Sequence, residues 1–236
     1  MSSPYPRSRL SLASSHKPVR RVLSRSRTCF RGKFPGLREN RTIGHEGWIE
    51  GDVLVLFAMS PAIAAVTEQP LHIYFPNGSA ICQYTPDFEV FLADGSGRSA
   101  FVEAKPLRYY EQEEVHSRLA QVEAYLQREG EQLVVLTEQS VQQEPRLDTL
   151  KSLRKYLPRT PLSHDAVYCA LRRAISANVR TVGQLVSLLG WATTVSLLTR
   201  GYAQFDLGKP RTDSTQIYLF EEPRHDWFFI SQEHGF

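Results

Sequence analysis

The stretch Tyr84–Pro106, YTPDFEVFLADGSGRSAFVEAKP, contains two strand-like apolar runs joined by a turn over residues 94–97. Asp87 opens the first run, and Glu103 and Lys105 close the second. Residues two apart in a strand share a face, so Glu103 and Lys105 lie side by side, and Asp87 joins them if it faces the same way. Two carboxylates that hold Mg²⁺ and one ammonium that orients water suit phosphodiester hydrolysis. The alternative is a solvent-facing salt bridge across an ordinary hairpin.

The flanking segments predict an α/β fold in which helices pack on a sheet. A helix within residues 45–63 stops before Pro61, and an amphipathic helix within 109–130 stops at Gly130. The expected strands form an antiparallel meander over 70–75, 80–92 and 99–106, followed by a buried strand over 132–138.

The C-terminal part changes character and predicts three helices followed by a hairpin. The helices fall within 165–176, 181–190 and 192–201, and the strands within 202–207 and 215–220. Thr181 and Gln184 form a capping-box pair, and Gly190 ends that helix. This order is typical of a winged helix over 163–222, in which Lys209 and Arg211 of the wing contact phosphates. Winged helices also dock proteins, and the aromatic tail 223–236 either packs on the domain or is an exposed anchor.

Positive charge is concentrated at the start of the chain. Residues 1–43 hold eleven Lys and Arg residues and one acid, Glu39. Such an arm cannot fold alone and suits binding along phosphates, partly disordered or bound to DNA. The candidate DNA-binding residues in the arm are Arg31, Lys33, Arg38 and Arg41. The alternatives are a solvated leader or a transit-type sequence. No apolar run approaches the roughly 18 residues of a membrane helix, so we expect a cytoplasmic protein without a membrane partner.

Pro86-Asp87, Glu103 and Lys105 resemble the P-D…(D/E)-x-K signature of restriction-endonuclease-like nucleases. Upstream, residues 31–70, which end in Glu-Gln-Pro, resemble the entry to the TnsA-type endonuclease domain, and the likeness extends over about residues 30–157. The resemblance implies a restriction-endonuclease-like mixed sheet over 44–158, followed by the winged helix. It places catalytic roles on Glu50, Asp87, Glu103 and Lys105. Mg²⁺, for which Mn²⁺ can substitute, is then held by Glu50, Asp87, Glu103 and the carbonyl of Ala104.

The same resemblance implies a function. A TnsA-type protein is the subunit of a bacterial, nucleoid-associated transposase that cleaves the 5′ strands at transposon ends, with the recombinase TnsB and the AAA+ regulator TnsC as partners. Two alternatives stay open: a stand-alone restriction or repair nuclease, and a non-catalytic DNA-binding or docking protein on a nuclease fold. Glu46 also competes with Glu50 as the helix acid, although periodicity favours Glu50.

Overall fold

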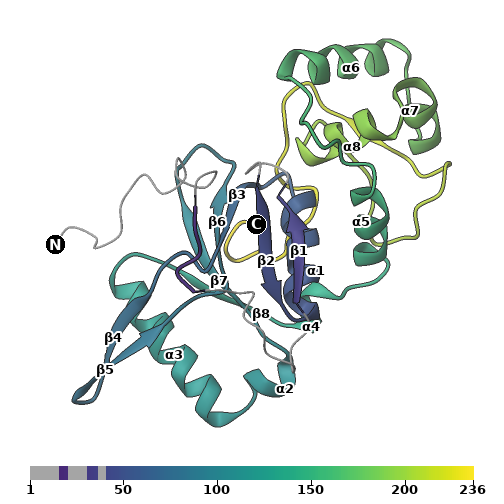
Figure 1. Cartoon of the computed structure of the whole chain (residues 1–236). Helices are drawn as coiled ribbons and strands as arrows, with labels where there is room; N and C mark the ends of the chain where they lie inside the picture. Colours follow the sequence, from purple (N-terminus) through teal and green to yellow (C-terminus); the bar gives the residue numbers. More distant parts are fainter. Residues whose placement is uncertain (1–15, 21–30, 37–40) are drawn as a thin grey trace. The chain divides into compact units, whose positions relative to one another are not determined.

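A computed structural model describes residues 16–20, 31–36 and 41–236 (Figure 1). The chain divides into two compact units that are not consecutive in sequence. The first unit comprises Met1–Leu54 and Ile63–Val141, and the second comprises Val55–Ala62 and Gln142–Phe236.

A mixed four-stranded sheet forms the centre of the first unit. Its strands, in spatial order, are β3 (Ile63–Glu68), β6 (Phe88–Leu92), β7 (Ser99–Ala104) and β8 (Leu133–Leu136). β6 is antiparallel to both β3 and β7, whereas β8 is parallel to β7. A parallel neighbour needs a crossover, and the helical segment between β7 and β8 provides it. The α/β prediction is therefore confirmed in this coarse form.

Two further hairpins lie in this unit, and they correct the predicted meander. β1 (Arg31–Pro35) pairs with β2 (Thr42–Glu46), and β4 (Ile73–Asn77) pairs with β5 (Ala80–Tyr84). The run 80–92 is thus two strands in different sheets, because Pro86 lacks the N–H that a continuing ladder needs. β3 was missed altogether, since its run IAAVTE lacks the apolar and polar alternation of a half-buried strand, although Ile63, Val66 and Thr67 favour strands.

Four helices of the described residues lie wholly or partly in the first unit, and α1 continues from it into the second. They are α1 (Trp48–Met59), which ends before Pro61 as predicted, α2 (Leu107–Tyr110), α3 (Glu113–Arg128) and α4 (Glu138–Val141). The buried face of α3, formed by Leu119, Val122 and Leu126, belongs to one core with Phe75 and Phe101. Each such leucine stabilises the fold by about 1.5–3 kcal/mol.

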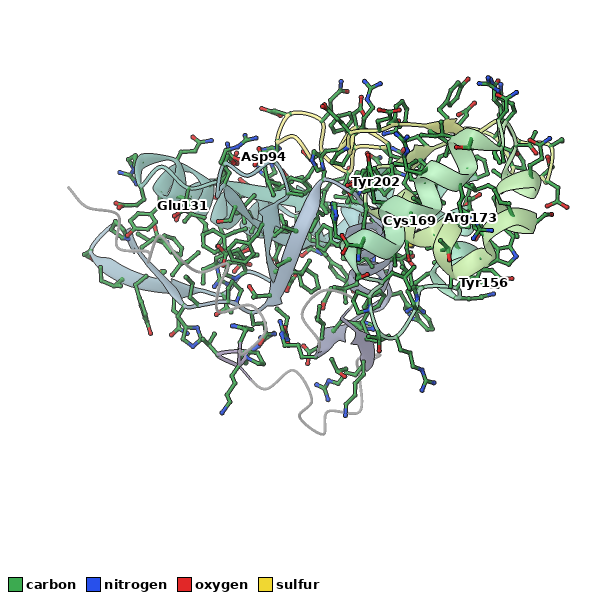
Figure 2. All side chains as sticks on the ribbon, turned by 90° about the horizontal axis from the view of Figure 1, so that it is seen from above. Asp94, Glu131, Tyr156, Cys169, Arg173 and Tyr202 are labelled. Carbon is green, nitrogen blue, oxygen red and sulfur yellow. The ribbon has the colours of Figure 1, made fainter. Side chains whose placement is uncertain are left out.

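The second unit contains the helical C-terminal region. Its elements are α5 (Arg146–Arg154), α6 (His164–Ser176), α7 (Val182–Leu189), α8 (Trp191–Thr199), β9 (Ala203–Gln204) and β10 (Tyr218–Leu219). Figure 2 labels Cys169 and Arg173, which lie one turn apart on α6. The capping box of Thr181 and Gln184 is confirmed, and Gly190 ends α7 at φ +77°. β9 and β10 pair antiparallel over two residues each, so the observed strands are much shorter than the predicted ones.

The C-terminal tail packs within the second unit. Trp227 and Phe228 are buried, and the Trp227 indole N–H donates to the Phe205 carbonyl at 2.9 Å. Phe236 is fully buried, with its ring 6.5 Å from that of Phe57 on α1. Of the two alternatives for the tail, packing is therefore correct for these residues.

Membrane-spanning potential is low in the described residues. None of their helices alone has the length and apolarity to cross a membrane, and only the sharply bent pair α7 and α8 meets that test jointly.

Candidate active site

Asp87 lies at the junction between the β4–β5 hairpin and the central sheet, and its backbone and side chain are both fixed. Its carbonyl accepts a hydrogen bond from the Gln69 N–H at 2.8 Å. Its carboxylate Oδ2 accepts one from the Ala104 N–H at 2.9 Å, just beyond the last β6–β7 pair. The side chain therefore replaces a ladder partner and is held beside the end of β7.

Glu103 is buried at that end of β7, and each of its carboxylate oxygens has a protein partner. The Tyr84 hydroxyl donates to Oε2 at 2.6 Å, and the Lys105 ammonium lies 2.7 Å from Oε1. The strand period predicted the pairing of Glu103 with Lys105. Tyr84 was missed, because a tyrosine closing a strand carries no signal that separates a core ring from a site residue.

Glu50 occupies the first turn of α1, where its Oε2 accepts a hydrogen bond from the Glu46 N–H at 2.8 Å. Glu46 itself ends β2, outside the helix, and pairs with Arg31 at 3.0 Å. Gly47 makes the link between β2 and α1 at φ +95°, a backbone conformation that favours glycine. Of the two candidate acids, Glu50 is therefore the one that lies in the helix.

The charges of neighbouring acids affect the ionisation of both Glu50 and Asp87. Burial raises the pKa of Glu50 to about 8, and the negative charges of Glu46 and Glu103 add to that rise. Burial likewise raises the pKa of Asp87 well above its usual range, and the charges of Glu103 and Glu50 contribute. Lys105 responds in the opposite sense. Desolvation alone would lower its pKa, but Glu103, Asp87 and Glu50 together raise it.

A pocket of about 420 Å³ opens beside these groups. Asp87, Glu103 and Lys105 line it, together with Arg20 from the N-terminal arm and Arg118 from α3. Glu50 and Ala104 are not in the lining. A broader depression of about 1070 Å³ lies along α7, but it is lined mostly by apolar and neutral polar residues and by a single acid, Asp213.

The oxygen donors in and beside the pocket fit a divalent cation in their chemistry. Asp87, Glu103 and the Ala104 carbonyl offer hard oxygens, and a cation would offset the repulsion that raises the pKa values of Asp87 and Glu50. In residues 16–20, 31–36 and 41–236, no three acidic, histidine or cysteine side chains are already grouped closely enough to chelate an ion. The carboxylates are instead turned toward protein donors.

No protein-family model matches the chain. No curated protein matches it either.

The predicted DNA-binding residues lie in varied surroundings. Lys33 is exposed on β1, whereas Arg31 pairs with Glu46 and Arg41 forms an ion pair with the buried Glu68. Arg38 lies outside the described residues. In the second unit, Lys209 is exposed 3.6 Å from Asp206, and Arg211 stacks on the Trp191 ring at 4.6 Å.

Sequence reasoning also missed the two arginines of the pocket. Arg118 lies on α3 three residues after Val115, at the edge of the apolar stripe. Its guanidinium donates a hydrogen bond to the Gln83 carbonyl at 3.0 Å. A basic residue at the edge of a buried stripe is the signal that would have found it. Nothing in the sequence separates Arg20 from the other basic residues of the arm.

Proposed function

We propose that this protein is a metal-dependent DNA endonuclease of the TnsA type. One observation supports this most directly. Asp87, just before β6, and Glu103, near the end of β7, line one pocket with Lys105, and the half-buried Glu50 of α1 interacts with Asp87 electrostatically. An exposed salt bridge would give no reason for the raised pKa values of Asp87 and Glu50.

The residues of the pocket divide the chemistry among them. Glu50, Asp87, Glu103 and the Ala104 carbonyl would hold Mg²⁺, with Mn²⁺ able to substitute. When bound, the ion would supply a water of lowered pKa and neutralise charge on the phosphate. Lys105 orients the attacking water and stabilises developing negative charge, and the Tyr84 hydroxyl keeps Glu103 in place. Hydrolysis leaves a 5′-phosphate and a 3′-hydroxyl.

The finer fold assignment belongs to the same proposal. The order β3-β6-β7-β8, with a crossover helix before the parallel strand β8, is compatible with a restriction-endonuclease-like core. Three helices followed by the short β9–β10 pair, with a further bridge between Thr181 and Gln216, are compatible with a winged helix. In this proposal Lys209 and Arg211 form its wing.

The biological setting follows from the TnsA resemblance. The chain cleaves the 5′ strands at the ends of a bacterial transposon as one subunit of a heteromeric transposase, with TnsB cutting and joining the 3′ ends. TnsC is the expected partner of the C-terminal region, and the nucleoid is the expected location.

The test is nicking of an end-labelled duplex that carries transposon ends, in Mg²⁺ or Mn²⁺, with and without the TnsB-type recombinase. We expect 5′-strand cleavage that needs the metal and is reduced at least about a hundredfold by Asp87→Ala or Lys105→Ala. Asp94→Ala is the matched control. It removes an exposed carboxylate from the β6–β7 turn of the same hairpin, labelled in Figure 2.

Each other outcome points to a different function. Cleavage of plain duplex without a partner would favour a stand-alone nuclease. Equal cleavage by wild type and both site variants would show that the hairpin acids are structural. DNA binding without cleavage under every condition would favour the non-catalytic alternative.

A further inference from the structure

A short segment of the basic arm, His16–Arg20, docks beside the pocket. The His16 imidazole Nε2 lies 2.7 Å from the Glu68 carbonyl, and the Val19 N–H donates to the Gln69 carbonyl at 3.2 Å. Gln69 has φ +41°, and its own N–H holds the carbonyl of Asp87. The segment is therefore anchored on the residue that also positions a predicted metal ligand.

This anchoring places the Arg20 side chain in the pocket lining with Asp87, Glu103 and Lys105. Its charge counts among those that lower the pKa of Glu50, against the larger effects of burial and neighbouring acids. The guanidinium also lies 3.6 Å from Glu46 Oε2, with 60% of the side chain exposed. An exposed pair at that distance contributes little, so a ligand can displace it at small cost.

Glu46 does not need Arg20. Arg31 already pairs with the other oxygen of Glu46 at 3.0 Å, with its side chain only 16% exposed. A structural ion pair is therefore a poor reason for Arg20 to be in this position. A role in the pocket explains its position better. A phosphodiester that enters the pocket approaches Asp87, Glu103 and Glu50, all of which repel it when ionised, and a nearby cation would offset that repulsion.

We propose that Arg20 binds a phosphate of the DNA strand in the pocket, next to the one on which Lys105 acts. A guanidinium presents paired N–H donors that match two phosphate oxygens, whereas an ammonium acts as a point charge. Arg20 thus recruits the phosphate backbone to a site whose carboxylates would otherwise reject it. This inference rests on the proposed nuclease function and adds a substrate-binding residue to it.

The test uses the full chain and a fluorescent duplex that carries transposon ends, with Ca²⁺ in place of Mg²⁺, and follows anisotropy over a range of salt concentrations. We expect Arg20→Ala to weaken binding about tenfold and to reduce the salt slope by about one. Arg20→Lys should keep the slope and recover only part of the affinity. Lys17→Ala, an equal charge loss in the same docked segment, is the matched control.

A double-mutant cycle between Arg20 and Lys105 distinguishes a DNA contact inside the pocket from general electrostatic attraction of DNA by the basic arm. The losses from Arg20→Ala and Lys105→Ala should be non-additive by at least about threefold, since both side chains contact neighbouring phosphates. Those from Lys17→Ala and Lys105→Ala should add.

Two kinds of failure are distinguishable. If wild type cleaves and Asp87→Ala does not, but Arg20→Ala binds like wild type or couples to Lys105 no more than Lys17 does, the inference about Arg20 is wrong and the nuclease stands. If wild type fails to bind the duplex, or wild type and Asp87→Ala behave alike in the nicking assay, the proposed function is wrong and Arg20 loses its role with it.

Discussion

Glu103 is held on both sides, and this makes Tyr84 a positioning residue for it. The hydroxyl of Tyr84 bonds one carboxylate oxygen while Lys105 takes the other. Burial, followed by the nearby charges of Glu103 and Asp87, raises the pKa of Tyr84 well above its usual range. The raised pKa keeps the phenol protonated at neutral pH, so it remains a hydrogen-bond donor to Glu103.

Tyr84→Phe should lower kcat for nicking about tenfold and leave KM nearly unchanged. The ring still fills the core, but Glu103 loses a hydrogen bond of about 1.5–3 kcal/mol that fixes its orientation. Steady-state kinetics in Mg²⁺ measures this split. Tyr74→Phe removes the hydroxyl of an exposed tyrosine on the same hairpin and should match wild type. A Tyr84→Phe variant with the kcat of wild type would mean that Lys105 alone positions Glu103.

Glu50 makes stability depend on pH. Its carboxyl has a pKa of about 8 in the folded protein and an ordinary value of 4.5. Between these values the folded state keeps a proton that the unfolded chain has lost, so the free energy of unfolding falls as pH rises through this window. Glutamine does not ionise, so in Glu50→Gln the free energy of unfolding should not fall with pH for this reason. Urea unfolding should show the variant about 1–3 kcal/mol more stable than wild type at pH 8.5, with little difference at pH 4.5.

The control for this effect is Glu123→Gln, an equal charge change on the exposed face of α3. Its effect on the free energy of unfolding should be small at both pH values. A difference between Glu50→Gln and wild type that does not grow with pH would contradict the assignment of a buried, repelled carboxyl.

The strands β1 and β2 and the first turn of α1 meet around the His45 ring. A methyl group on Gly32 would lie 2.2 Å from its Nε2, and one on Gly51 would lie 3.0 Å from its Cε1. The ring also donates through Nδ1 to the Gly47 carbonyl at 3.2 Å. Burial lowers the pKa of His45, which favours the neutral ring in this contact. The lack of side chains at Gly32 and Gly51 therefore leaves room for the His45 ring between the β1–β2 hairpin and the first turn of α1, which carries Glu50.

Gly32→Ala should lower the free energy of unfolding by about 1–3 kcal/mol, because the buried imidazole must move. Urea unfolding measures the loss. In a His45→Ala background the same substitution should cost less than about 0.5 kcal/mol, since the obstructing ring is gone. Equal costs in the two backgrounds would show that glycine is required at position 32 for a reason other than the ring.

Elements with a strong local pattern were predictable, and those set by tertiary contacts were not. α3 has an apolar stripe and α7 has a capping box, so both were found within a few residues. β3 depends on its pairing with β6, and nothing local indicates that partner. The predicted site residues came from a strand period and a family resemblance, whereas Tyr84 and Arg20 reach the pocket only through long-range packing.

The C-terminal tail is part of the core of the second unit. Besides the Phe57 and Phe236 rings, the His225 Nδ1 lies 2.8 Å from the Pro61 carbonyl, and the Arg146 guanidinium donates to the Phe229 carbonyl at 3.0 Å. The last residue of the described chain therefore packs against the end of α1, a helix that begins in the first unit.

Phe236→Ala should destabilise the second unit by about 3–5 kcal/mol, the usual cost of removing a fully buried phenylalanine. Calorimetry of wild type and variant measures this cost as a lower midpoint. Phe229→Ala, which removes a ring that is 38% exposed in the same tail, should have a much smaller effect. Equal midpoints for Phe236→Ala and wild type would contradict the buried position.

The nested composition of the two units limits how evolution or an engineer can recombine them. Since Val55–Ala62 belong to the second unit while Ile63–Val141 return to the first, no single cut in the polypeptide separates the two. A cassette starting near residue 142 would lack the strip of α1 on which Phe236 rests, and a nuclease fragment ending there would carry that strip uncovered. Exchange of the C-terminal region between relatives would therefore succeed only when residues 55–62 are exchanged with it.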